Sequence, residues 1–255
     1  MQSRCRARKV AADFSAAVTH GCVIAALLQV QVHLHLHRMY IPSHFAETDA
    51  ARLADLIAQY GFATLISTNG VDTEITHAPL MYEPDRGDAT NKGTLVGHVA
   101  AANPHARLLV DGAEVIAIFH GPHGYISPTW YRDENPRVPN VPTWNYAVVH
   151  VHGMVKRIDD AERKWKIVSD LAAQYERDSV APWNAGEMDG HAGKLGAIVG
   201  FDIAITNISA KLKLSQNRSV ADQENVIARL EAGVHPDGQA MAKMMRANLA
   251  RKGGD

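Results

Sequence analysis

The stretch FATLISTNGVDTEITHAPLMY, residues 62–82, predicts a β-hairpin. Asn69-Gly70 is a residue pair that favours the left-handed backbone of tight hairpin turns. The runs on either side, Phe62–Ser67 and Ile75–Tyr82, are rich in apolar and β-branched residues, as strands are. The sequence therefore places an antiparallel strand pair early in the chain.

Four further β-like runs come after the hairpin, separated by turn residues. They are Thr94–Val99, Val115–Phe119, Ala147–Val155 and Val199–Ile208. The last two alternate in the manner of half-buried strands, with apolar faces made by Val149, Val151 and Val155 and by Phe201, Ile203 and Ile205. About six strands in hairpin-like order predict a mainly β, α+β fold: an antiparallel barrel with flanking helices.

Helical periodicity marks four segments around these strands. The first has Thr48 as its expected cap and an apolar face of Leu53, Leu56, Ile57 and Tyr60. The second, Asp160–Glu176, has Asp159 as its expected cap and a predicted buried stripe of Trp165, Val168, Ala172 and Tyr175. Ser219 to Asp222 is a capping-box pattern that opens the third. The fourth begins at Pro236, and its methionines indicate packing: Met241, Met244 and Met245.

The composition favours a folded domain without a dominant charge. Hydrophobic residues make up 46% of the 255 residues, charged residues 21%, and the formal net charge is −1. Such a balance indicates a core and no general DNA- or membrane-binding surface. The only cysteines, Cys5 and Cys22, precede Met39. Disulfides and thiolate chemistry are therefore excluded from the main domain, which fits a cytoplasmic protein.

Residues 1–38 differ from the rest of the chain. Basic residues precede a short apolar stretch, Val23–Leu28, in an order that resembles a signal peptide. Polar residues and histidines interrupt the chain beyond that stretch, no cleavage site stands out, and the stretch is too short to span a bilayer. We therefore expect residues 1–38 to be a non-native or disordered leader, Met39 to be the natural start, and residues 39–252 to form the domain.

The segment Lys211–Arg218 is a candidate anion site. In an extended chain, Lys211, Lys213 and Ser215 share one face. Two ammonium groups and a hydroxyl suit a phosphate, and the rest of the segment adds donors. A solvated strand edge protected by lysines is the alternative that the residues leave open.

Loops near the middle of the chain carry aromatic rings and histidines. The rings are those of Trp130, Tyr131, Trp144 and Tyr146. They suit the walls of a site for a planar ring such as isoalloxazine, or core packing beneath a loop. Two histidine pairs stand out, His120 with His123 and His150 with His152. No third metal ligand is placed by the sequence, and we expect no metal. Neither a nucleotide-binding glycine loop nor a catalytic triad is recognisable.

Several of these segments together resemble the PaiB-like FMN-binding negative transcriptional regulators. The blocks are Tyr40–Phe45, Gly97–Pro104, Gly121–Tyr131, Val141–Tyr146 and Lys211–Asn217. They occur in family order, which is more specific than any single motif. The resemblance implies an FMN-binding split β-barrel related to pyridoxamine-phosphate-oxidase-like proteins. It also implies a homodimer with flavin at the subunit interface, and repression of genes for protease production and sporulation.

The resemblance further implies a cofactor site. The FMN phosphate would be held by Lys211, Lys213 and Ser215, and the ring would be walled by Trp130 and Trp144. The ribityl chain or ring edge would bond to His98, Asn103, Thr143 and Gln216. Two residues depart from the family pattern: Ala101 replaces a frequent arginine, and Leu212 replaces a common aromatic residue. The first departure would remove a contact and the second would weaken ring packing.

The residues leave the choice between functions open. We expect an FMN-binding repressor rather than a dedicated enzyme, with DNA contacted directly or through a partner and no membrane association. No helix-turn-helix is evident, although the C-terminal segment is basic, with Lys243, Arg246, Arg251 and Lys252. The alternative is an FMN-dependent oxidoreductase or flavin reductase that uses NAD(P)H. A flavin-free or haem-binding barrel is a third reading.

Overall fold

The computed structural model describes residues 39–86, 92–131, 140–183, 186 and 192–252. All of the helices and strands that it describes belong to the unit formed by Ile41–Asp255. The expected leader, residues 1–38, lies outside the described residues.

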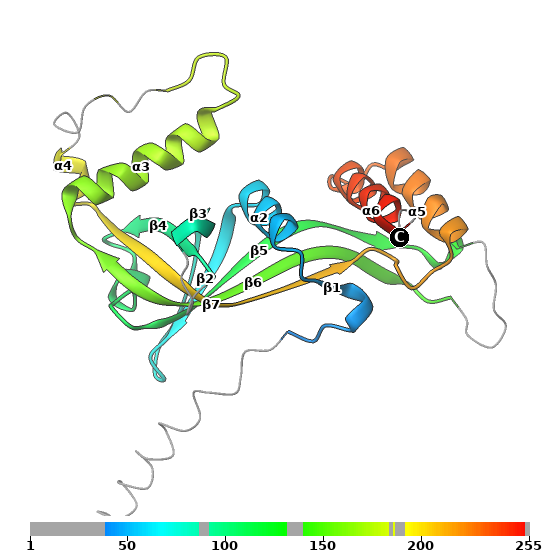
Figure 1. Cartoon of the computed structure of the whole chain (residues 1–255), viewed down its shortest axis with the longest axis horizontal. Helices are drawn as coiled ribbons and strands as arrows, with labels where there is room; N and C mark the ends of the chain where they lie inside the picture. The colour runs from blue at the N-terminus through cyan, green and yellow to red at the C-terminus, as the bar shows by residue number, and fades with distance from the viewer. Residues whose placement is uncertain (1–38, 87–91, 132–139, 184–185, 187–191, 253–255) are drawn as a thin grey trace, which may run out of the picture. The chain divides into compact units, whose positions relative to one another are not determined.

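The fold is built on a seven-stranded antiparallel sheet (Figure 1). Its strands are β1 (Ala46–Glu47), β2 (Phe62–Thr68), β3 (Thr73–Glu83), β4 (Thr94–Ala100), β5 (Glu114–Ile126), β6 (Thr143–Ile158) and β7 (Ile198–Lys213). Their order is β1-β7-β4-β3-β2-β5-β6, and a further pairing of β7 with β6 closes the sheet into a barrel. The predicted antiparallel barrel is confirmed.

The β2–β3 hairpin forms where the sequence predicts it. Gly70 has a φ of 88°. The side-chain oxygen of Asn69 accepts hydrogen bonds from the backbone N–H groups of Val71 and Asp72 at 2.9 and 2.8 Å. A left-handed glycine and an Asx side chain that binds the backbone just ahead of it are what such a turn requires.

All six predicted strands are longer in the structure, and β5, β6 and β7 are extended most, because pairing carries them through residues of low strand propensity. β5 continues past Phe119 to Ile126, through Gly121 and Pro122. Its register against β6 shifts between His120 and His123. Such a bulge lets a proline sit within a strand. β6 and β7 pair along nearly their whole length.

The inner faces of the strands form the core. The alternation predicted for β6 and β7 is confirmed, since all of these side chains are buried: Val149, Val151, Val155, Phe201, Ile203 and Ile205. Leu212, near the end of β7, and Leu214, just past it, join the same cluster. The outer face of the sheet is therefore free to carry polar groups.

Helices flank the barrel, and in the view of Figure 1 they lie above its long strands. They are α2 (Ala50–Gln59), α3 (Ala161–Glu176), α4 (Ala192–Leu195), α5 (Val220–Ala232) and α6 (Gly238–Lys252). Short 3-10 turns are η2 (Ser43–Phe45), η3 (Pro84–Arg86), η4 (Pro104–Arg107) and η5 (Pro128–Trp130). No helix within the described ranges is long and apolar enough to cross a membrane.

One of three expected helix caps is correct and two are displaced by one residue. Ser219 caps α5 as expected, accepting from the N–H of Asp222 at 3.2 Å. Asp49 caps α2, where Thr48 was expected, and Asp160 caps α3, where Asp159 was expected. A capping oxygen must reach the N–H three residues ahead. Each of these two helices starts one residue later than expected, so the residue one position later, an aspartate in both cases, is the cap.

The predicted buried stripe of α3 is wrong. The buried residues of this helix are Lys164 and Ile167, whereas Tyr175 is 54% exposed. Ile167 packs against Met81 and Val96 on the outer side of the barrel. The Lys164 ammonium donates to the carbonyl of Leu195 at 2.8 Å. The helix therefore docks by a narrow face, and Tyr175 lies outside that face.

α5 and α6 form a helical pair at the other end of the sheet. Met241 and Met245 are buried in the main core, and Met244 packs against it. The prediction that these methionines serve in packing is confirmed for this chain.

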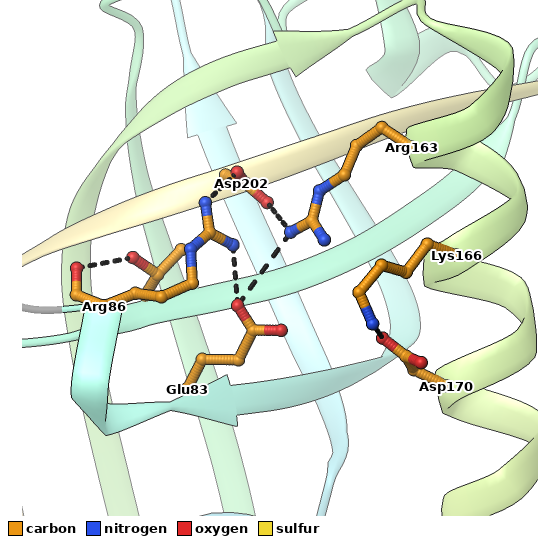
Figure 2. A network of polar contacts seen from close by, with 7 residues as sticks. Glu83, Arg86, Arg163, Lys166, Asp170 and Asp202 are labelled. Carbon is orange, nitrogen blue, oxygen red and sulfur yellow. Dashed lines mark hydrogen bonds and ion pairs between the residues drawn. The ribbon is translucent and has the colours of Figure 1, made fainter.

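An arginine–carboxylate network ties α3 to the barrel (Figure 2). Asp202 on β7 accepts from Arg86 at 2.6 Å and from Arg163 of α3 at 3.2 Å. Glu83 accepts from Arg86 at 2.6 Å. Asp202 is only 7% exposed, so its carboxylate depends on these two guanidinium groups.

Changing Asp202→Asn is expected to lower the free energy of unfolding by about 1–3 kcal/mol, because two charge-assisted hydrogen bonds lose their charge. Asp170→Asn is the matched control. Its carboxylate forms an exposed ion pair with Lys166 at 2.7 Å on the same helix, and such pairs contribute only about 0.3–0.5 kcal/mol. Urea unfolding followed by circular dichroism measures both. Equal losses in the two variants would contradict a structural role for the network.

Candidate functional site

One side of the sheet, facing away from the core, gathers the polar side chains of several strands. Residues that lie opposite each other in antiparallel pairs point to the same side. His77 of β3 lies opposite Thr64 of β2. His120 of β5 and Lys211 of β7 both lie opposite Val148 of β6. We call this side the outer face.

Three cations meet where β6 begins and β7 ends; Lys211, Lys213 and Arg218 form what we call the cationic corner. The Lys213 ammonium donates to the hydroxyl of Thr143 and the carbonyl of Trp144, at 2.7 Å each. Burial lowers the pKa of Lys213, and the nearby charges of Lys211 and Arg218 lower it further. A bound anion offsets such repulsion, so the corner fits a phosphate.

Two of the three cations of the corner, Lys213 and Arg218, have contacts with neutral groups. Neither Lys213 nor Arg218 forms an ion pair within the part of the chain that the structure describes. Arg218 instead stacks on Tyr131, with its guanidinium carbon 4.2 Å from the ring centre, and donates to Asn140 at 2.9 Å. The sequence indicated Arg218 only as one more donor, and the structure makes it the third cation of the corner.

Ser215 does not continue the face of the two lysines. β7 ends at Lys213, and Ser215 has a φ of 62°, so the extended conformation expected for all three residues is wrong at Ser215. Ser215 is 3% exposed, and its hydroxyl accepts from the side-chain amide of Asn145 at 2.9 Å. A left-handed, buried serine with this partner shapes the turn at the end of β7.

Gln216 lies in the same turn, and Leu212 lies in the core. The Gln216 side chain accepts from the N–H of Leu214 at 2.6 Å and donates to the carbonyl of Leu212. Leu212 is 2% exposed and packs inward. The departure from the family pattern at residue 212 therefore changes core packing, and not the surface that carries the lysines.

The two tryptophans expected to wall one ring have different neighbours. Trp144 is 49% exposed, and its ring centre lies 5.7 Å from that of His123 and 6.3 Å from that of Tyr125. Trp130 packs against the main core, and its carbonyl accepts from Asn225 of α5. Among the ring contacts of the described residues, none joins the two indoles.

His98 and Asn103 lie toward the opposite end of β7 from the lysines. His98 is paired with Gly200, and residues 200–211 separate that point from Lys211, which is about 36 Å of extended strand. Burial lowers the pKa of His98. Asn103 caps η4 by accepting from the N–H of His105 at 3.0 Å. One FMN molecule cannot reach both groups within one chain.

A groove of about 500 Å³ opens on the outer face and contains none of the predicted site residues. It is lined by Gln59, Tyr60, Gly61, Phe62, Thr64, His77, His120 and Tyr175. The Thr64 hydroxyl lies 3.1 Å from Nδ1 of His77 and 3.3 Å from Nε2 of His120. Burial lowers the pKa of His120, and His77 and His123 lower it further.

Sequence patterns pointed to only part of this groove. The His120–His123 pair drew attention as a candidate half of a metal site, but the partner of His120 comes from β2, and only the strand register shows that. Across the described residues, no three side chains of His, Cys, Asp or Glu converge as metal ligands.

Comparisons with known proteins identify the family of this chain. A family model described as "Putative FMN-binding domain" matches residues 39–207. The "Protease synthase and sporulation protein PAI 2" of Bacillus subtilis is 33% identical over 84% of this chain and 100% of its own length. An uncharacterized protein of Emericella nidulans is 26% identical over 82% of this chain and 96% of its own length.

Among solved structures, the FAD and heme binding protein from Mycobacterium smegmatis has a TM-score of 0.50 at 19% identity, over 72% of this chain and 79% of that chain. The closed antiparallel sheet with its flanking helices places the chain in the split β-barrel class. Within that class, the chain belongs to the PaiB-like FMN-binding family, and FMN is its cofactor.

The buried histidines predict how stability depends on pH. Burial lowers the pKa of both His98 and His105. Near the ordinary histidine pKa of about 6.5 the unfolded chain binds protons that the folded chain does not, so the free energy of unfolding falls as pH drops below about 6.5. Urea unfolding at pH 7.5, 6.5 and 5.5 measures this. His98→Gln should show a smaller fall, and equal stability at all three values would contradict the prediction.

Proposed function

We propose that this chain is an FMN-binding repressor of transcription that works as a cytoplasmic homodimer. The observation that carries the proposal is the 33% identity to the Bacillus subtilis protein named for protease synthase and sporulation, over that protein's full length. A flavin gives such a regulator a way to respond to redox state or flavin supply.

Within this proposal, the cationic corner holds the FMN phosphate through Lys211 and Lys213. Thr143 and Trp144 stand beside Lys213 and position its ammonium. The distance along β7 means that His98 and Asn103 meet the same flavin only from a second subunit. In a flavin site between two subunits, one subunit contributes the lysines at the end of β7. The other subunit contributes His98 and Asn103 near the start of its β7, so both ends of the strand contact one cofactor.

An exposed apolar row on the outer face supports the homodimer. Ile66 of β2 lies opposite Ile75 of β3 on one side and Ile116 of β5 on the other. Ile75 is 61% exposed, and the other two are half-buried. We call these three residues the isoleucine row. Contiguous apolar surface of this kind is typical of an interface, and a second copy of the chain covers it here.

The basic residues near the C-terminus favour DNA contact through a partner. Arg246 makes two hydrogen bonds to Glu231 of α5, at 2.9 and 2.8 Å, and Arg251 lies 3.3 Å from Glu47. Arginines that already pair with carboxylates of the same chain are less available to phosphates of DNA. We therefore propose that the α5–α6 pair serves in packing and that DNA is contacted through a partner.

The test is transcription from the promoter upstream of the protein's own gene. Deleting the gene should raise transcript levels, and complementation from a Met39 start should restore repression. Unchanged transcripts after deletion would contradict the repressor role. A gel shift with the same promoter at low salt separates the two routes: a shift by the purified protein alone would establish direct binding and contradict the partner.

A second function, FMN-dependent reduction with NAD(P)H, is favoured by one observation. The groove on the outer face is large enough for a small substrate and holds a histidine, His120, whose pKa is lowered by burial. Bound flavin supplies the redox chemistry, and the protein supplies orientation. Steady oxidation of NAD(P)H by FMN-loaded protein would support an enzyme, and its absence would exclude these reductants.

A further inference from the structure

The strand register arranges the outer face in three rows that run across the strands. The first row continues the isoleucine row: Ile116 lies opposite His152 of β6, and His152 lies opposite Asn207 of β7. The second row, read from β3 to β7, is His77, Thr64, Ile118, His150 and Ser209. The third row is His120, Val148 and Lys211. Histidines and apolar side chains therefore share one surface beside the isoleucine row.

The ionisable groups of these three rows are all bases. They are His77, His120, His150, His152 and Lys211. Carboxylates on the neighbouring surface lie beyond the rows. Glu114 stands opposite Met154 at one end of β5, and Oδ2 of Asp237 lies 3.6 Å from Nε2 of His123 near the other. Protonation of a histidine within the rows is therefore not offset by a carboxylate of the same rows.

Two of the histidines are neutral near pH 7. Burial lowers the pKa of His120, and the nearby rings of His77 and His123 lower it further. Burial also lowers the pKa of His150, and the rings of His152 and His120 lower it further. Both rings therefore bind protons only well below the ordinary histidine pKa of about 6.5. A neutral imidazole can be covered by another protein surface at little cost, whereas an unpaired imidazolium cannot.

We propose that the homodimer interface extends from the isoleucine row over His120, His150 and His152, and that acid opens this interface by charging the rings. The partner is a second copy of the chain, because the histidines continue the apolar surface that the second copy covers. In a two-fold dimer each copy buries the same patch, so every protonated ring adds a positive charge on both sides. The inference rests on the proposed homodimer and not on repression of transcription.

The direction of the pH effect follows from the burial of the rings. A second copy that covers His120 and His150 lowers their pKa further, so the free chain binds protons that the dimer excludes. Association is therefore full near pH 7.5 and weakens as pH falls below about 6.5. Each excluded proton lowers the association constant by up to about 10-fold per pH unit.

Sedimentation velocity over a concentration series, at pH 7.5 and pH 5.0, tests the inference on protein saturated with FMN. The wild-type dimer should weaken by about 10-fold or more at the lower pH. His120→Gln with His150→Gln keeps both sites neutral and should remove most of that change. His44→Gln is the matched control, since His44 is an exposed histidine of η2 outside the three rows. FMN is present throughout, so its phosphate contributes equally to every protein.

A permanent charge tests the same idea without acid. His150→Lys places an ammonium in the second row, and at pH 7.5 it should weaken the dimer by about 10-fold or more. His44→Lys adds the same charge outside the rows and should leave association unchanged. Circular dichroism at pH 7.5 checks that both variants fold as the wild type does.

The outcomes separate this inference from the homodimer itself. A wild-type dimer that is equally tight at both pH values, or a double glutamine variant that weakens as much as the wild type, overturns the inference and leaves the homodimer standing. A His150→Lys dimer as tight as the wild type does the same. A wild-type chain that is monomeric at pH 7.5 overturns both. Acid dissociation that the glutamines suppress and His150→Lys reproduces at pH 7.5 establishes the histidines as part of the interface.

Discussion

Replacing both Lys211 and Lys213 with alanine is expected to weaken FMN binding by about 100-fold or more. Hydrogen bonds between charged partners contribute about 1.5–3 kcal/mol each, and two of them are lost. The Lys213 ammonium is already held by Thr143 and Trp144, so it is oriented before the phosphate arrives. Pre-oriented donors lose little entropy on binding.

Riboflavin, which lacks the phosphate, makes this experiment specific. Its affinity should change little in the double variant, because only the phosphate contacts are removed. Lys166→Ala with Lys243→Ala is the control, since both are exposed lysines on helices and neither belongs to the corner. Flavin fluorescence measures the affinities of the wild type and both double variants for the two flavins, and circular dichroism checks the fold. Equal losses for FMN and riboflavin would show that the lysines support the fold rather than the phosphate.

Changing Ile75→Glu is expected to weaken the proposed homodimer by about 100-fold, because an interface that buries an unpaired carboxylate loses several kcal/mol. Ile75 is 61% exposed in the single chain, so the fold itself should tolerate the change. Sedimentation velocity over a concentration series measures the association. FMN affinity should fall in parallel if the flavin lies between subunits.

Val71→Glu is the matched control for that change. Val71 is 89% exposed at the tip of the β2–β3 turn, outside the isoleucine row. It should leave both association and FMN affinity unchanged. A wild-type chain that stays monomeric at all concentrations, or a dimer that survives Ile75→Glu unweakened, would remove the isoleucine row from the interface.

Much of the fold could be predicted because its signals are local. Asn69-Gly70 carries its own turn geometry, and Ser219 reaches an N–H only three residues away. The alternation along β6 and β7 reflects one periodic choice between core and solvent. Where a signal depended on a neighbour elsewhere in the chain, prediction was wrong, as for the face of α3 that contains Ile167.

Some features of the site could likewise be predicted from the sequence, and others depended on strand register. Residue types and spacing predicted an anion site at Lys211 and Lys213, and the structure places both lysines beside Arg218 in a corner that fits a phosphate. The sequence could not show that His98 lies far from them along β7, since that distance depends on the register of β4 against β7. Nor could it show that Thr64 bridges His77 and His120, residues from three different strands.

The sequence by itself determined the barrel class, the hairpin, the strand alternation and the family, because each rests on contacts between residues close in the chain or on blocks that stand in a set order. Tertiary structure alone decided which polar groups share a surface. A strand's outer face is defined by two-residue alternation, but the neighbours on that face come from other strands, and their identity depends on register. A one-residue slip in β5 would turn His120 away from Thr64 and abolish the groove's polar floor.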